Sequence, residues 1–85
     1  MRANRAFELL VSRDGREPAF LADRRRLDRL EVVSVETGEV VFFWELPVRA
    51  AAKLERQLRA DLAAMEAGAF VDRWSRDDVA GGRPL

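Results

Sequence analysis

The chain has 85 residues, among them no cysteine, histidine or tyrosine. A chain of this length forms one domain and buries roughly 60–65% of the surface that its unfolded form exposes. The lack of cysteine excludes disulfides and thiolate metal sites, and the apolar fraction of 48% argues against disorder. Fifteen basic residues balance fifteen acidic ones, whereas nucleic-acid-binding domains are usually plainly basic.

Membrane and export signals are not expected in this sequence. No apolar run approaches the roughly 20 residues that a membrane span requires. The opening segment is basic, but Glu8 interrupts its short apolar stretch, so it does not resemble a secretory signal. We therefore expect a cytoplasmic protein with no membrane partner.

A β-hairpin is predicted near the start of the chain. Residues 6–12 alternate in the way typical of a half-buried strand. Asp14-Gly15 favours a type I′ turn, so residues 17–22 become the return strand. Because Pro18 has no N–H to donate, this strand should lie at a sheet edge. The pairs expected across the hairpin are Val11 with Pro18 and Leu9 with Phe20.

Residues 23–29 allow two interpretations. Asp23 could cap one helical turn that directs Leu27 and Leu30 inward. The arginine-rich sequence is equally compatible with a polar loop. We favour a short turn or loop.

A second hairpin is predicted from residues 30–36 and 39–45, around Gly38. A two-residue turn at Thr37-Gly38 would pair Val35 with Val40, whereas a type I turn with a glycine bulge would pair Val35 with Glu39. Both registers remain open. In either one, three apolar side chains share one face and two point to the other; these sets are Val40, Phe42 and Trp44, and Val41 and Phe43.

One long amphipathic helix is predicted over residues 47–67, with a short continuation over 69–74. Pro47 suits the first helical position because its missing N–H costs no hydrogen bond there. Apolar residues at helical spacing fall within about 80° of arc, and these are Ala51, Leu54, Leu58, Leu62, Met65 and Ala69. We expect Phe70, Val71 and Trp74 to pack a final turn, and Gly68 either to end the helix or to lie within it. Residues 75–85 have little apolar content and read as a flexible tail.

These elements predict a single α+β domain over residues 1–74. Its architecture would be a four-stranded antiparallel β-meander, made of two hairpins and packed against one long C-terminal amphipathic helix.

Catalysis is not expected. Without histidine, cysteine or tyrosine, the commonest general bases and nucleophiles are missing. Glu36 and Glu39 flank a turn, where a solvated carboxylate is a poor acid catalyst at neutral pH. No calcium-loop spacing and no glycine-rich phosphate loop is present. We predict a protein that is not an enzyme and that has no cofactor and no metal.

Arginine clusters raise the alternative of a nucleic-acid-binding accessory protein. Clustered cations bind phosphates and release counterions. The balanced net charge and the acids Asp23 and Asp28, which bracket the arginine run, argue against it. The candidate contacts are Arg24, Arg25, Arg26, Arg29, Arg49, Lys53 and Arg56.

The acidic, apolar hairpin is the basis of the leading hypothesis. Residues 31–48 contain four glutamates and no basic residue. One helix covers only one face of a sheet, so Val41 and Phe43 would face outward, and exposed apolar patches usually mark interfaces. We therefore predict a small non-enzymatic interaction module that forms a homodimer or binds a protein partner, with the candidate interface Val41, Phe43, Val32, Leu10 and Leu21. The other alternative is a monomer in which the first hairpin covers the second face.

Overall fold

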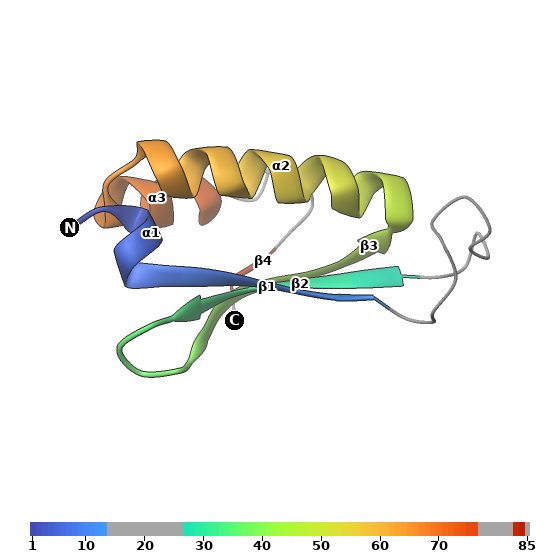
Figure 1. Ribbon diagram of the computed structural model, residues 1–85, viewed down its shortest axis with the longest axis horizontal. Coiled ribbons are helices and arrows are strands. Elements are labelled where there is room, and N and C mark those ends of the chain that lie inside the picture. Colours follow the sequence, from blue (N-terminus) through green and yellow to red (C-terminus); the bar gives the residue numbers. More distant parts are fainter. Residues whose placement is uncertain (14–26, 77–82, 85) are drawn as a thin grey trace.

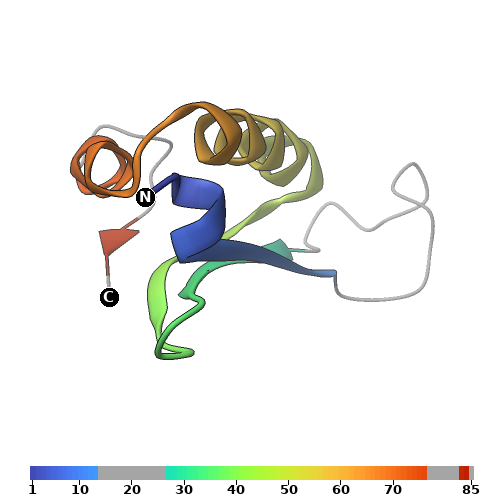
Figure 2. The ribbon, with the colours of Figure 1, turned by 60° about the vertical axis from the view of Figure 1, so that its left-hand side comes forward.

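The computed structural model describes residues 1–13, 27–76 and 83–84. Within these residues the elements are, in chain order, α1 (Ala3–Ala6), β1 (Phe7–Arg13), β2 (Leu27–Ser34), β3 (Val40–Pro47), α2 (Val48–Ala64), α3 (Ala67–Trp74) and β4 (Arg83–Pro84). Three long antiparallel strands form the sheet in the order β1-β2-β3, and the two-residue β4 is added beside β3. The three helices lie on one face of this sheet (Figures 1 and 2). The α+β class is as predicted.

The strand order corrects the predicted meander. Leu9 pairs with Val32 and Val11 with Leu30, so β1 lies directly beside β2 and no strand separates them. The predicted order, with a further strand between these two, is therefore wrong. Residues 17–22, with the predicted partners Pro18 and Phe20, lie outside the described residues.

The prediction of a turn or loop at residues 23–29 is wrong for its last three residues. Leu27, Asp28 and Arg29 begin β2. Asp28 pairs with Arg13 on one side and with Leu46 on the other, so two ladders hold this segment in a strand. These partners lie far along the chain, and their hydrogen bonds prevail over a polar local sequence.

The β2–β3 turn follows neither predicted register. Ser34 N–H donates to Glu39 O (2.8 Å), and Gly38 N–H donates to Ser34 O (2.8 Å), which encloses a four-residue loop. Gly38 has φ of +76°, the left-handed conformation expected of it. Side chains support the wider loop: Thr37 N–H donates to Ser34 Oγ (3.3 Å), and Glu39 N–H donates to Thr37 Oγ1 (3.2 Å).

An irregularity at Val41 changes which residues share a face of β3. Val33 pairs with Val40 but Val32 pairs with Phe42, so Val41 is an extra residue in the ladder. Val40 therefore stands opposite Val33 rather than on the face of Phe42. The predicted grouping of Phe42 with Trp44 holds, since both are buried, whereas the placement of Val40 with them is wrong.

The predicted long helix is two helices. α2 begins at Val48, one residue after Pro47, and ends at Ala64. Met65 then adopts an extended conformation (φ −106°, ψ 156°) before α3 begins at Ala67. The break is held by the N-terminal segment, because Ala3 N–H donates to Met65 O and Ala67 N–H donates to Met1 O, both at 2.9 Å. Arg2 Nη1 also donates to Ala64 O (3.3 Å), a carbonyl at the end of α2.

The apolar stripe of α2 packs on the sheet as predicted, and its buried members are Ala51, Leu54, Leu58 and Leu62. Beyond the break the stripe fails: Met65 is half-buried and Ala69 is exposed. Gly68 lies inside α3, and Phe70 and Trp74 are buried there as expected.

An aromatic cluster joins α3 to the sheet. Trp74 meets Trp44 edge-on, with ring centroids 5.7 Å apart, and Phe70 stacks on Phe7 at the same distance. Such pairs contribute about 0.5–1.5 kcal/mol each beyond the area that they bury. The core therefore lies between the helices and one face of the sheet.

Candidate interaction surfaces

The face of the sheet opposite the helices is called here the open face. No helix in the described part of the chain lies on it (Figures 1 and 2). Alternation and register assign it the following side chains of the three long strands: Glu8, Leu10, Ser12, Leu27, Arg29, Glu31, Val33, Val40, Phe43, Glu45 and Pro47. Five of these eleven residues are polar, so the open face is mixed rather than continuously apolar.

Polar side chains cover the aromatic ring at its centre. The guanidinium carbon of Arg29 lies 4.8 Å from the centroid of the Phe43 ring. Arg29 Nε is also 3.4 Å from Glu31 Oε1, and Glu31 lies between Leu10 and Phe43 in the ladder. Phe43 is consequently half-buried although no helix covers it.

Four of the five residues predicted to form one interface are described, and these four do not lie together. Leu10, 43% exposed, and Phe43 lie on the open face. Val32 is fully buried beneath the helices, beyond the reach of a partner, and its neighbour Val33 faces the open side instead. Val41 is half-buried and packs against the core because of the irregularity in β3. Leu21 lies outside the described residues.

The outer edge of β1 was not predicted as a site, and it is a more distinctive feature than the open face. Val35 N–H donates to Ala6 O (3.0 Å), whereas Ser34 N–H donates to Glu39 O. Successive residues of a strand direct their backbone N–H and C=O groups alternately to one side of the strand and to the other. Since Ala6 bonds to β2, the residues that also do so are Glu8, Leu10 and Ser12. The residues between them direct theirs away from the sheet, and these are Phe7, Leu9, Val11 and Arg13. Among the described residues no strand pairs with β1 on that side.

The opposite edge of the sheet differs, since β4 covers part of it. Arg83 pairs with Phe43 and Pro84 with Phe42. The flexible tail over residues 75–85 stays a prediction, since most of those residues lie outside the described part of the chain. Proline has no N–H to offer to a further strand, which blunts an edge.

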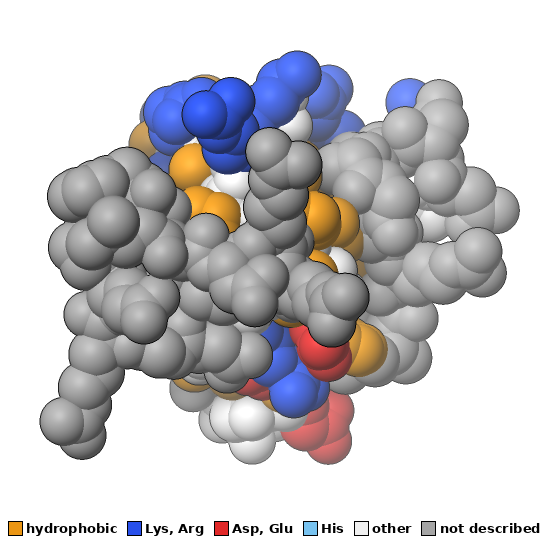
Figure 3. Space-filling view, turned by 90° about the vertical axis from the view of Figure 1, so that its right-hand side faces the viewer, with side chains coloured by type: hydrophobic (Ala, Val, Ile, Leu, Met, Phe, Trp, Pro, Cys, Tyr) orange, Lys and Arg blue, Asp and Glu red, His pale blue; other side chains and the backbone are white. Residues whose placement is uncertain are grey.

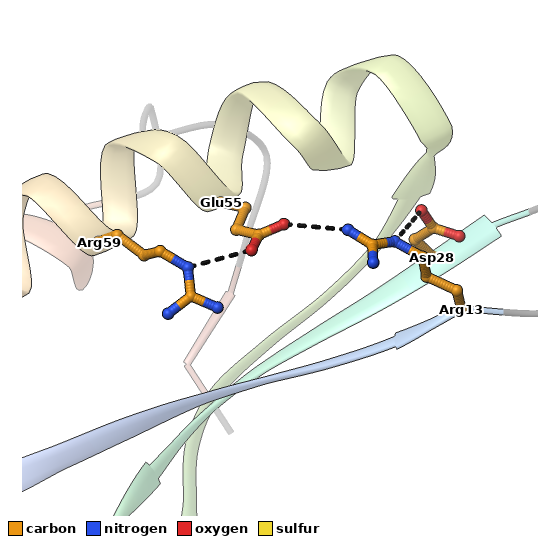
Figure 4. A network of polar contacts seen from close by, with 4 residues as sticks. All are labelled: Arg13, Asp28, Glu55 and Arg59. Carbon is orange, nitrogen blue, oxygen red and sulfur yellow. Dashed lines mark hydrogen bonds and ion pairs between the residues drawn. The ribbon is translucent and has the colours of Figure 1, made fainter. Parts of the chain in front are cut away.

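A charged network ties β1 to the helix above it (Figure 4). Arg13 Nη2 lies 3.3 Å from Glu55 Oε1, and Arg13 Nε lies 3.7 Å from Asp28 Oδ2. Arg59 Nε reaches the other oxygen of Glu55 at 3.0 Å. Asp28 is the buried charged residue of the described chain, with 3% of its surface exposed. The sequence could have indicated this network through Asp28, a charged residue at a strand position that faces the core. That position is recognised only when β2 is known to begin at Leu27.

Charge is divided between the two layers of the molecule. The helical segments, residues 1–6 and 48–76, carry eight basic and four acidic residues, a net charge of +4. The strand segments, residues 7–13 and 27–47, carry two basic and six acidic residues, a net charge of −4. Figure 3 shows Lys and Arg gathered over the helices at the top and Asp and Glu toward the sheet at the bottom.

The candidate nucleic-acid contacts that the structure describes lie on two faces of the molecule. Arg49, Lys53 and Arg56 are exposed on α2, and no ion pair joins them to an acid of the described residues. Arg29 lies on the open face, across the molecule from α2. Arg24, Arg25 and Arg26 lie outside the described residues.

Groups that would indicate metal binding do not assemble in the described chain. Residues 1–13, 27–76 and 83–84 contain no cluster of three acidic or other metal-ligating side chains. Glu36 and Glu39 are exposed beside the turn. The described helices include none that is long and apolar enough to cross a membrane.

Known proteins add no further assignment, since no protein-family model, curated protein or solved structure matches the chain.

Proposed function

We propose that this domain is a small non-enzymatic interaction module that self-associates through the parts of its sheet that no described helix covers, namely the open face and the adjoining outer edge of β1. The observation that carries the proposal is the outer edge of β1, which has no partner strand among the described residues and directs the backbone groups of Leu9 and Val11 away from the sheet. An unpaired edge strand is a ready template for another strand.

The sequence of this edge strengthens the proposal. Natural proteins protect free edges with charged side chains, lysine above all, and with proline, bulges or very short strands. β1 spans seven residues, contains neither proline nor lysine, and carries its two charged residues, Glu8 and Arg13, near its ends. Its ladder with β2 is regular from Phe7 to Arg13. The half-buried Val11 and the exposed Leu10 supply apolar surface on its two faces, so a partner strand would bury side chains above and below the sheet.

Sedimentation equilibrium of the whole chain over a micromolar concentration series tests self-association. We expect a monomer–dimer equilibrium. Leu10→Arg should weaken it because the charge would be buried at the seam, whereas Lys53→Ala on the helical face should leave it unchanged. A strict monomer across the series, with Leu10→Arg and Phe43→Asp both without effect on solubility and fold, would overturn the proposal.

A second candidate function, nucleic-acid binding, is favoured by the separation of charge between the layers. The helical layer has a net charge of +4, and Arg49, Lys53 and Arg56 form a band at spacings of four and three residues on α2. Those spacings place the three side chains on one side of a helix. Phosphate groups could bind such a band even though the charge of the whole chain is zero.

Fluorescence anisotropy with a labelled duplex and a labelled single strand, at about 50 mM salt, tests this second candidate. Binding through α2 should weaken at least about tenfold in Lys53→Glu, and it should fall steeply as salt is raised. Arg29→Glu is the matched control, because it makes the same change of charge on the opposite face. No binding at low salt, or an equal loss in both variants, would exclude binding through α2.

A further inference from the structure

The free edge of β1 is self-complementary. In an antiparallel pair of β1 strands centred on Leu10, each residue from Phe7 to Arg13 finds a partner in the other copy. The pairs are Leu10 with Leu10, Leu9 with Val11, Glu8 with Ser12 and Phe7 with Arg13. Centring the pair on Leu9 or Val11 would leave part of the strand unpaired. No like charges face one another in the pairing centred on Leu10, since Glu8 meets a serine and Arg13 meets a phenylalanine.

The backbone groups suit the same register. Leu9 and Val11 point outward, so each Leu9–Val11 pair forms two hydrogen bonds. Phe7 N–H already donates to Ala3 O within the chain, but its carbonyl is free to accept from Arg13. Leu10 directs its own groups to β2, so the pair on the axis is a non-hydrogen-bonded pair, in which side chains approach most closely.

The side chains suit it as well. A two-fold axis perpendicular to the sheet keeps the helices of both copies on one side. Leu9 and Val11 then meet across the seam on the helical face, where Val11 and Phe7 are half-buried at the margin of the core. Leu10, 43% exposed, meets its own copy on the open face.

A second copy fits this edge better than the hairpin predicted from the sequence. In that hairpin Pro18 would stand opposite Val11, whose carbonyl points outward and needs an N–H donor. Proline has none. On the other edge β4 pairs with Phe42 and Phe43, which leaves β1 as the long strand with no paired neighbour along its outer side in the described chain, and pairing along β1 closes after two copies.

We propose that the partner is a second copy of this chain, joined to the first along β1 with the two-fold axis at Leu10. The inference rests on the proposed self-association and specifies its geometry. The product is one continuous sheet across both copies, with all helices on one face.

Single-cysteine variants test the register, because the chain has no cysteine of its own. In a non-hydrogen-bonded antiparallel pair the Cα atoms are about 4.5 Å apart, within the range that a disulfide spans. Leu10→Cys should therefore form a covalent dimer on mild oxidation. Glu8→Cys and Ser12→Cys should each crosslink poorly alone but efficiently with one another when mixed. Lys53→Cys, on the exposed side of α2, gives the background level.

A pair of proline variants tests the hydrogen bonds of the edge. Val11 N–H points away from β2, so Val11→Pro removes intermolecular hydrogen bonds and no bond of the β1–β2 ladder. We expect at least about a tenfold weaker dimer with circular dichroism close to that of the unmodified chain. Ser12→Pro, whose N–H points to β2, should instead unfold the sheet.

The outcomes distinguish failure of the β1 pairing from failure of self-association itself. A dimer in which Leu10→Cys crosslinks no better than Lys53→Cys, or that Val11→Pro leaves intact, would overturn the β1 pairing but keep the proposed function. A chain that stays monomeric at every concentration would overturn both. Covalent dimers of Leu10→Cys, together with the mixed Glu8→Cys and Ser12→Cys product, support the register.

Discussion

Arg29 lies over the ring of Phe43, with its guanidinium carbon 4.8 Å from the ring centroid. The two residues stand on neighbouring strands, and Arg29 is also held by Glu31 at 3.4 Å. A cation over an aromatic face at an exposed site contributes about 0.5–1 kcal/mol. The pair therefore turns an aromatic residue of the open face into a surface that is partly polar.

Arg29→Ala should uncover Phe43. We expect a decrease of about 1 kcal/mol in the free energy of unfolding and stronger fluorescence of a dye that binds exposed apolar surface. Arg5→Ala, which removes an exposed arginine of α1, should change neither quantity. Equal dye binding by Arg29→Ala and the unmodified chain would show that the guanidinium does not shield the ring.

The two tryptophans should respond differently to the same substitution. Trp74 Nε1 donates to Asp61 Oδ2 (3.0 Å), whereas the buried Trp44 Nε1 has no hydrogen-bond partner among the described residues. Trp74→Phe loses a hydrogen bond, but Trp44→Phe removes an unsatisfied donor. We expect Trp74→Phe to lower the free energy of unfolding by about 1–3 kcal/mol more than Trp44→Phe. Urea denaturation followed by far-ultraviolet circular dichroism measures both, and equal losses would contradict the prediction.

Alanine should act in opposite directions at two glycines. Gly68 lies within α3, and an added Cβ would meet nothing within 4 Å. Gly68→Ala should therefore raise the free energy of unfolding by about 0.4–1 kcal/mol. Gly38 has φ of +76°, so Gly38→Ala should lower it by about 1–2 kcal/mol. Thermal denaturation of the two variants checks the signs, and a destabilised Gly68→Ala would contradict the helical placement of that residue.

The two arginines that contact Glu55 should contribute unequally to the free energy of unfolding. Arg59 forms an exposed pair with Glu55 one helical turn away, a type of pair that contributes about 0.3–0.5 kcal/mol. Arg13 joins Glu55 to Asp28, whose side chain is 4% exposed, and so links the edge strand to the helix. We expect Arg13→Met to lower the free energy of unfolding by about 1 kcal/mol or more and Arg59→Met by less.

Urea titrations at low salt and at about 1 M salt check this difference. At about 1 M salt the Debye length is near 3 Å, so the loss in Arg59→Met should shrink toward zero, while much of the loss in Arg13→Met remains. If Arg13→Met and Arg59→Met lose the same free energy of unfolding at each salt concentration, Arg13 forms an ordinary surface ion pair.

The amino-acid sequence by itself determined the features that depend on neighbours a few residues apart. The spacing of Leu54, Leu58 and Leu62 predicted the buried side of α2. Alternation predicted β1 and β3 to within two residues at each end, and the position of Gly38 predicted a turn with positive φ. A local pattern suffices in these cases because the periodicity of a helix or a strand is itself local.

Only the tertiary structure decided the features that depend on distant partners. α2 ends at Ala64 because backbone groups of Met1 and Ala3 bond to residues around Met65, more than sixty positions away. Asp28 lies in a strand because Arg13 and Leu46 pair with it from both sides, and the extra residue at Val41 reverses the expected position of Val40. The free edge of β1 has the same origin. Alternation predicts that β1 is a strand, but only the hydrogen bonds between strands decide which of its sides is paired and which remains open to a partner.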